Sequence, residues 1–161
     1  MKRMKSLALL FLACATLNCM PTAQAAGLPL VQNFTVDARE SIAKQAPILV
    51  LFMSNTCPYC ETVLQDFLLP MQRDHAYDNK VILRQLEIGS TAQLIGFNGE
   101  TTTPSAFAVA HKVWAVPTVM LFDSKGHVLT KIVGLLTLDF YLAYLDDAID
   151  GSQQKIKAAA H

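Results

Sequence analysis

An apolar run that leads straight into two closely spaced cysteines is the feature that most constrains the fold of this chain. The run covers residues 48–53 and suits a β-strand that is buried on both faces. Cys57 and Cys60 follow it, and apolar residues then recur with helical spacing as far as Met71. The pattern predicts a strand, a cysteine pair at the start of a helix, and a kink or end of that helix at Pro70.

The rest of the chain favours further strands and helices around this unit. The sequence predicts, in chain order, a helix at 36–45, a strand at 81–88, a helix at 103–112, a hairpin of strands at 118–122 and 127–133, and a helix at 137–149. Strands that alternate with helices in this way indicate an α/β domain with a central mixed sheet.

Capping and turn residues predict where several of these elements begin and end. Asp37, with an acid three residues later, forms a capping box for the first helix. Thr103 is expected to cap the helix at 103–112. The polar stretch before it reads as an inserted loop or hairpin around Asn98-Gly99. From residue 150 to the end, we expect a flexible tail.

The first residues have the pattern of a secretory signal peptide. A basic start precedes an apolar run of about a dozen residues, whereas a membrane-spanning helix needs about 20. A small-residue stretch with Ala23 and Ala25 then offers a cleavage site. We therefore expect residues 1–25 to be removed and residues 26–161 to form one exported, periplasmic domain. A lipid anchor at Cys19 is the alternative.

Loss of the signal peptide changes both the cysteine count and the charge. Cys14 and Cys19 are lost, so Cys57 and Cys60 are the only cysteines of the mature chain. The full chain has no formal net charge, and the signal peptide carries basic residues but no acid. The mature chain is therefore slightly acidic, which excludes a strongly basic nucleic-acid binder.

A cysteine pair with this spacing has three physical interpretations. Half of a zinc site would need two further ligands, and the mature chain has no other cysteine and no histidine pair with ligand spacing. A structural disulfide that closes so small a loop would constrain the unfolded chain weakly. A redox centre explains the position best, because the amides and dipole of a helix N-terminus stabilise a thiolate on Cys57. Cys60, one turn later, would then resolve the mixed disulfide.

The chain resembles the thioredoxin superfamily over residues 36–149. The resemblance rests on the strand before Cys57-Pro58-Tyr59-Cys60, on the segment 116–126 (VPTVMLFDSKG) and on Val133-Gly134 before the last helix. The insert and the helix after it resemble an exported thioredoxin-like subgroup related to the catalytic domains of bacterial disulfide isomerases and reductases. The resemblance implies a thioredoxin-like fold, a central mixed β-sheet flanked by helices, with Cys57 and Cys60 as catalytic residues.

The resemblance also implies a substrate site opposite the cysteines. Pro117 matches a cis-proline that lies against the disulfide, which would leave the main chain of Val116 free to pair with an extended substrate. A trans proline that starts an edge strand is the alternative. Trp114 is either an apolar platform for a protein partner or a core residue. Pro58 and Tyr59 are expected to tune the redox potential.

The sequence departs from thioredoxin at two positions near the cysteines. The buried acid that helps to move the proton off the second cysteine is replaced by Leu51, and the tryptophan before the first cysteine is replaced by Thr56. Glu87, at the end of a predicted strand, is a candidate proton acceptor for Cys60, although a glutamate at such a place is more often solvated.

These expectations favour a thiol:disulfide oxidoreductase that reduces disulfide-containing exported proteins. We expect a monomer recharged by a membrane electron donor, without a metal, nucleotide or flavin. The direction of electron flow depends on how strongly the protein stabilises the Cys57 thiolate relative to the disulfide. A difference of about 1.4 kcal/mol in this stabilisation shifts the reduction potential by about 30 mV. Alternatives are a disulfide oxidase, a thioredoxin-fold binding protein that uses the cysteines for Cu(I) or another soft metal, and a structural partner in a larger complex.

Overall fold

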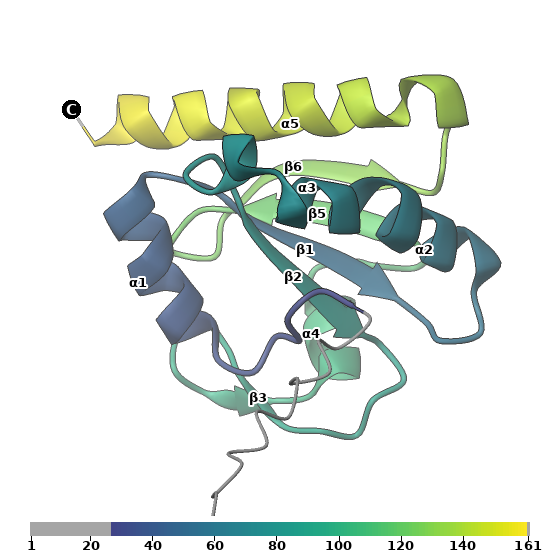
Figure 1. Cartoon of the computed structure of the whole chain (residues 1–161). Coiled ribbons are helices and arrows are strands. Elements are labelled where there is room, and N and C mark those ends of the chain that lie inside the picture. The colour runs from purple at the N-terminus through teal and green to yellow at the C-terminus, as the bar shows by residue number, and fades with distance from the viewer. Residues whose placement is uncertain (1–26, 161) are drawn as a thin grey trace, which may run out of the picture.

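The structure of the chain, a computed structural model, describes residues 27–160 (Figure 1). The predicted signal peptide, its cleavage site and Cys19 lie outside the described residues. Within residues 27–160, no helix combines the length and the apolar character that a membrane span requires.

A four-stranded mixed sheet forms the centre of the fold, in the order β2-β1-β5-β6. Its strands are β1 (Ile48–Met53), β2 (Ile82–Glu87), β5 (Thr118–Phe122) and β6 (Val128–Val133). β1 runs parallel to β2 and antiparallel to β5, and β5 runs antiparallel to β6. The strand predictions are confirmed, and the two central strands are buried along their whole length, as their unbroken apolar runs require.

The segment before the first helix covers part of the outer edge of β2. The N–H of Val31 donates to the carbonyl of Gln85 at 3.0 Å, and the N–H of Gln85 donates to the carbonyl of Pro29 at 3.0 Å. The side chain of Gln85 also accepts from the N–H of Leu28 at 3.1 Å. At the other end of the sheet, β6 pairs with no further strand among the described residues.

Helices cover both faces of the sheet, with α5 above it and α4 below it in Figure 1. The helical segments are α1 (Phe34–Lys44), α2 (Pro58–Thr62), η1 (Val63–Leu68), α3 (Leu69–Arg73), η2 (His75–Tyr77), α4 (Pro104–Ala110) and α5 (Leu138–Ala159).

Alternating positions of β1 point into two separate cores. Leu49 and Leu51 pack with residues of α5 and of the continuous helix formed by α2, η1 and α3. Val50 and Phe52 pack with residues of α1 and α4. This alternation follows from the pleat of a strand that is covered on both faces. The predicted α/β architecture, a central mixed sheet flanked by helices, is confirmed.

The start of α1 differs from the prediction. Asn33 caps the helix, because its side-chain oxygen accepts from the N–H of Thr35 at 2.9 Å. Asp37 lies inside the helix, is only 4% exposed, and forms a salt bridge of 2.8 Å with Arg84 of β2. The predicted capping box is therefore wrong, because a tertiary ion pair holds the Asp37 carboxylate.

The helix after the cysteines passes through Pro70 and ends at Arg73. The turn before the proline is widened into the π-helical segment η1, in which the N–H of Leu69 donates to the carbonyl of Leu64. Pro70 has no N–H to donate, and a wider turn is one of the ways in which a helix accommodates such a residue. Of the two predicted outcomes, the end of the helix at Pro70 did not occur.

The inserted segment forms the predicted hairpin. Its strands β3 (Leu94–Ile95) and β4 (Thr101–Thr102) pair in antiparallel register. Gly99 adopts φ 82° in the turn, a conformation that favours glycine. Thr103 then caps α4 as predicted, since its hydroxyl accepts from the N–H of Ala106 at 3.2 Å.

The last helix corrects the expected flexible tail. α5 continues to Ala159, and the polar side chains of its last turns contact the rest of the domain. Ser152 is fully buried and its hydroxyl lies 3.1 Å from that of Thr130, while Lys155 donates to the carbonyl of Leu129 at 3.0 Å. These contacts extend the helix beyond the apolar repeat that predicted it.

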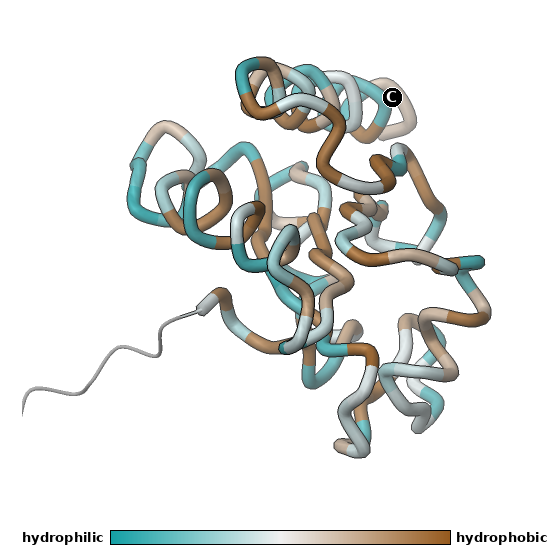
Figure 2. The backbone as a smooth tube through the Cα atoms, turned by 90° about the vertical axis from the view of Figure 1, so that its right-hand side faces the viewer, coloured by the Kyte–Doolittle hydropathy of each residue, from teal (hydrophilic) through white to brown (hydrophobic). Residues whose placement is uncertain are grey.

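The apolar face of α5 also differs from the predicted one. Figure 2 shows apolar and polar residues alternating around the turns of this helix. Tyr141, Leu145 and Ile149 are buried as expected, whereas Leu138 and Leu142 are exposed. The start of the helix therefore presents apolar side chains to solvent.

Candidate active site

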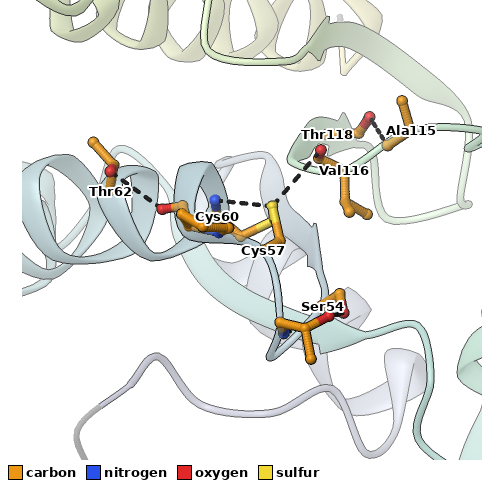
Figure 3. Close-up of a disulfide and its surroundings, with 9 residues drawn as sticks. Ser54, Cys57, Cys60, Thr62, Ala115, Val116 and Thr118 are labelled. Atoms are coloured by element: carbon orange, nitrogen blue, oxygen red, sulfur yellow. Dashed lines mark hydrogen bonds between the residues drawn. A yellow bond between two sulfur atoms is a disulfide. The ribbon is translucent and has the colours of Figure 1, made fainter.

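Cys57 and Cys60 form a disulfide at the start of α2 (Figure 3). Cys57 is the N-cap of the helix, and Pro58 occupies its first turn, where the missing N–H leaves no hydrogen bond unmade. The main-chain N–H of Cys60 donates to the sulfur of Cys57 at 3.2 Å. Cys60 is fully buried and Cys57 is partly exposed, so an incoming disulfide can reach only Cys57.

The helix start can stabilise negative charge on Cys57. Its sulfur already accepts a main-chain N–H, and the helix that follows continues to Arg73, so its dipole adds to this effect. The segment 54–62 contains no basic residue, and Glu61 in the first turn opposes a nearby thiolate. The main chain is therefore the source of thiolate stabilisation at this site.

The segment before β5 faces the disulfide. The Val116–Pro117 peptide bond is cis, and the sulfur of Cys57 lies 3.8 Å from the carbonyl oxygen of Val116. Two hydrogen bonds hold the segment: the Thr118 hydroxyl donates to the carbonyl of Ala115 at 2.7 Å, and the N–H of Gly134 donates to the carbonyl of Pro117 at 2.8 Å. Figure 3 shows Val116 beside Cys57, with Thr118 and Ala115, joined by their hydrogen bond, on the side of Val116 away from Cys57.

Two aromatic side chains near the disulfide project into solvent. Tyr59 follows Pro58 in the first turn of α2 and is 67% exposed. Trp114, two residues before Val116, is 76% exposed. Of the two interpretations of Trp114, its exposure favours a surface platform over a core residue.

The candidate proton acceptor does not contact the buried cysteine. The carboxylate of Glu87 accepts from the N–H of Gly89 at 3.1 Å in the turn after β2. Leu51 is fully buried in the core cluster that also contains Cys60. The described structure therefore shows neither a carboxylate at position 51 nor a hydrogen bond that Glu87 accepts from Cys60.

Sequence patterns missed one polar group in this core. Tyr141 was predicted only as part of the apolar face of the last helix, yet its buried hydroxyl has no hydrogen-bond partner among the described residues. It packs against Phe67, with ring centroids 5.0 Å apart. Periodicity cannot reveal such a hydroxyl, because a tyrosine and a phenylalanine give the same pattern.

The remaining titratable side chains of the described residues do not gather into a metal site. Between residues 27 and 160, no group of three or more His, Cys, Asp or Glu is arranged to hold a metal ion. His75 and His127 each pair with a carboxylate on the surface, those of Asp78 and Asp123. His111 packs among aromatic rings on the opposite face of the sheet.

Comparisons with known proteins agree with this geometry. The sequence matches the family described as "Thioredoxin-like domain" over residues 34–149. The structure is similar to a mutant thioredoxin from Halobacterium salinarum NRC-1, with a TM-score of 0.51 and 20% identity, over 83% of this chain and 96% of that one. It is also similar to a thioredoxin-fold protein from Helicobacter pylori, with a TM-score of 0.52 and 20% identity, over 71% and 81% of the two chains. A search of curated proteins found no match.

A third similar structure is mitochondrial thioredoxin 3 from Saccharomyces cerevisiae in its oxidised form. Its TM-score is 0.50 and its identity is 19%, over 76% of this chain and 93% of that one. At these identities the likenesses show the fold. The fold, together with a cysteine pair at disulfide distance, suggests thiol–disulfide redox chemistry.

Proposed function

The chain belongs to the thioredoxin-like domain family, and on that premise we propose that it is an exported thiol:disulfide oxidoreductase that reduces disulfides of periplasmic proteins. The observation that carries the proposal is the position of Cys57. Cys57 is a partly exposed residue at the start of a helix, and its sulfur lies 3.8 Å from the carbonyl oxygen of Val116. This distance supports the proposal, because it would put the nucleophilic sulfur beside the main chain on which a substrate would dock.

The reaction would proceed in two exchange steps. The Cys57 thiolate attacks one sulfur of a substrate disulfide, forms a mixed disulfide with it and releases the other sulfur as a thiolate. Cys60 then loses its proton and attacks the sulfur of Cys57, which restores the disulfide seen in the structure and releases the substrate as a dithiol. Two electrons pass from the cysteine pair to the substrate.

The segment at Val116 would hold the substrate during these steps. An extended peptide can pair with the main chain of Val116, and the exposed ring of Trp114 offers apolar contact to the same peptide. Tyr59, also exposed, would contact the substrate from the side of α2. Because these contacts use main chain and aromatic surface, they suit polypeptide substrates of varied sequence.

The reducing direction requires a reductant for each cycle. We propose a membrane electron donor that returns two electrons to the disulfide by the reverse exchange at Cys57. The Cys-Pro-Tyr-Cys sequence supports a reducing role because glutaredoxins, which reduce their substrates, also use it. A reduction potential close to that of thioredoxin, about −270 mV, would fit this direction, and one near −120 mV would indicate an oxidase.

Two cysteine variants test the proposal. Cys60→Ser should accumulate mixed disulfides on Cys57 when incubated with disulfide-containing periplasmic proteins, because the resolving thiol is missing. Cys57→Ser should trap none, and both variants should lose insulin-disulfide reduction. Retention of full activity in both variants would rule out the redox function.

A further inference from the structure

The outer edge of β6 carries main-chain groups that no other strand uses. Within residues 27–160, β6 pairs with β5 alone, whereas residues 29–31 cover part of the outer edge of β2. At the start of β6, the carbonyl of Leu129 already accepts from Lys155 at 3.0 Å. The open stretch of β6 is therefore residues 130–133. A strand edge of this kind can bind an extended polypeptide as one more strand.

An apolar groove runs along this open stretch. Figure 1 shows α5 passing along β6, and a groove of about 480 Å³ lies between them, with residues 130–133 as one wall. Leu136 and Tyr144 line the groove from the other side, and both are exposed. Phe140, also exposed, lies one turn before Tyr144 on the same face of α5. The strand edge is thus flanked by apolar surface.

Gly151 leaves additional room in the wall that α5 forms. It lies in the interior of a helix, where glycine is destabilising relative to alanine. A Cβ added at this position would have no atom within 4 Å, so packing within the domain does not require a glycine here. A chain that enters the groove can use the space that the missing side chain leaves.

The charged groups of the groove indicate the chemistry of its occupant. The ammonium groups of Lys131 and Lys155 donate to main-chain carbonyls of this chain, those of Lys112 at 2.6 Å and Leu129 at 3.0 Å. The carboxylate of Asp147 also lines the groove and has no salt-bridge partner among the described residues. An apolar segment with one basic residue complements this surface. A second copy of β6 fits less well, because it would bring its own Lys131 to the same short stretch.

The open stretch of β6 lies close to the substrate-docking segment at Val116. Its last residue, Val133, pairs with Thr118, which is two residues after Val116. The carbonyl oxygen of Val116 is 3.8 Å from the sulfur of Cys57. With about 4.8 Å between strands and about 3.5 Å for each extended residue, Val133 lies within roughly 16 Å of this sulfur. About five extended residues can therefore connect a cysteine at Cys57 to the groove.

We propose that the edge of β6 and the groove beside α5 bind an extended apolar segment of the polypeptide substrate, about five residues from the cysteine that Cys57 attacks. The segment pairs with the main chain of residues 130–133, its alternate side chains contact Leu136 and Tyr144, and a basic residue pairs with Asp147. This docking selects unfolded or partly folded polypeptides, because a folded protein pairs its strands internally. The inference rests on the proposed function in taking a disulfide-containing polypeptide as the substrate.

Synthetic peptides linked through their cysteine to thionitrobenzoate test the inference. The mature chain is reduced with dithiothreitol, freed of it and mixed with the peptide. The cysteine pair then passes two electrons to the peptide disulfide, which releases the peptide thiol and coloured thionitrobenzoate. A short peptide has only polar residues around its cysteine. Two tailed peptides add a spacer of about five residues and an apolar segment of about six residues with one lysine, on the N-terminal or the C-terminal side.

We expect one of the two tails to lower the half-saturating peptide concentration about tenfold with little change in the limiting rate, the effect of one or two net hydrogen bonds. N-methylation of every second residue in that tail removes main-chain donors and keeps the side chains, so it should abolish most of the gain. Glutamate in place of the lysine should abolish part of it. If neither tail lowers the half-saturating concentration, or if the N-methylated tail is as effective, the inference is wrong.

Two variants of α5 locate the binding. Gly151→Leu fills the groove, and Ala143→Leu adds the same side chain at an exposed position of α5 outside it. The tailed peptide should lose its advantage over the short one in Gly151→Leu and keep it in Ala143→Leu. Gly151→Leu should keep or raise the midpoint temperature of unfolding, because leucine favours a helix more than glycine does. An equal advantage in both variants would overturn the assignment of the groove.

Two further measurements separate the inference from the proposed function and from self-association. A tailed peptide with serine in place of cysteine should bind the wild type more tightly than Gly151→Leu, by fluorescence anisotropy. Such binding without reduction of any peptide would reject the reductase and retain the groove as a polypeptide site. Reduction of the short peptide without any effect of a tail would do the reverse. Sedimentation should show a monomer, and a dimer that Gly151→Leu dissociates would assign the groove to a second copy and reject the inference.

Discussion

The two faces of the central sheet are packed with different side chains. The face that carries the cysteines is covered mainly by aliphatic residues, with Cys60 and the hydroxyl of Tyr141 among them. The opposite face holds a group of aromatic rings in stacked and tilted contacts, formed by Phe34, Phe52, Phe97, Phe107 and Phe122. Near it, the carboxylate of Asp37 pairs with Arg84.

The difference indicates that one face of the sheet contributes mainly to stability and the other mainly to the chemistry of the cysteines. Aromatic pairs and ion pairs depend on defined geometry, so the packing of the aromatic face contributes to stability through specific contacts. The aliphatic face can admit the breaking and re-forming of the bond at the Cys60 sulfur without breaking a network of polar contacts. Substitutions on the aromatic face should therefore change the free energy of unfolding, and substitutions around the cysteines should change the chemistry.

The largest effect on stability is expected for Phe34→Ala. Phe34 is fully buried and stacks on Phe97 and Phe107, with centroids 4.4 and 4.6 Å away. Its loss should lower the free energy of unfolding by about 3–5 kcal/mol, measured by denaturant titration, because it leaves a cavity. The reduction potential should not change. A shift in the reduction potential would contradict the claim that the aromatic face affects stability but not the chemistry of the cysteines.

A smaller loss is expected for Gly126→Ala in the turn between β5 and β6. Gly126 adopts φ 84°, and an added Cβ would lie 2.7 Å from the Phe97 ring. Gly99→Ala is the matched control, because Gly99 has φ 82° and no atom within 4 Å of such a Cβ. The control should cost about 1 kcal/mol for the backbone alone, and Gly126→Ala about 1–3 kcal/mol more for the displaced ring. Equal losses would show that the insert does not depend on this contact.

A third test uses the pH dependence of the aromatic face. Burial, and then the charge of Lys131, lower the pKa of His111 below its usual 6.5, so the folded state favours the neutral ring. The neutral ring of His111 therefore stabilises the folded state above pH 6.5, and this stabilisation is lost as the pH falls below 6.5 and the ring gains a proton.

Between about pH 8 and about pH 5, the wild type should therefore lose more stability than His111→Phe, which keeps the ring packing. The difference should stay below about 1 kcal/mol, because solvent screens the half-buried ring. Glu40 and Asp123, whose pKa values are lowered, titrate below this window. Identical pH profiles would show that protonation of His111 does not destabilise this face.

The smallest effect on stability is expected for Trp114→Ala on the side of the cysteines. The ring is 76% exposed, so the free energy of unfolding should change by no more than about 0.5 kcal/mol. Reduction of a protein disulfide should nevertheless slow several-fold, while reduction of a small disulfide should not. Val109→Ala, at a residue 55% exposed on α4, is the control that should alter neither rate. Equal slowing with both substrates would argue against a platform for polypeptides.

The sheet and the position of the cysteines could be predicted because they depend on local patterns. The apolar run of β1 and the helical repeat after Cys60 both express burial, which dominates the choice of secondary structure. Thr103 was predicted correctly as a cap for the same reason, since its partner, the N–H of Ala106, is three residues away.

The errors arose where a side chain has a partner that is distant in the sequence. Asp37 was assigned to a cap because Arg84, which binds it, lies on another element. The polar end of α5 was taken for a tail because the contact between Lys155 and Leu129 leaves no local signal. At the candidate site, the sequence placed Cys57 and Val116 on facing segments only through resemblance, and it gave no indication that the hydroxyl of Tyr141 is unpaired.

The segment at residues 29–31 has a consequence for how copies of this protein can meet. It occupies hydrogen-bonding groups of Gln85 in the middle of β2, so that edge of the sheet cannot accept a long foreign strand. β6 is the edge left open among the described residues. Growth of a sheet through successive molecules requires two open edges on each. A molecule with one open edge can pair with a single neighbour at that edge, so association through the sheet stops at two molecules.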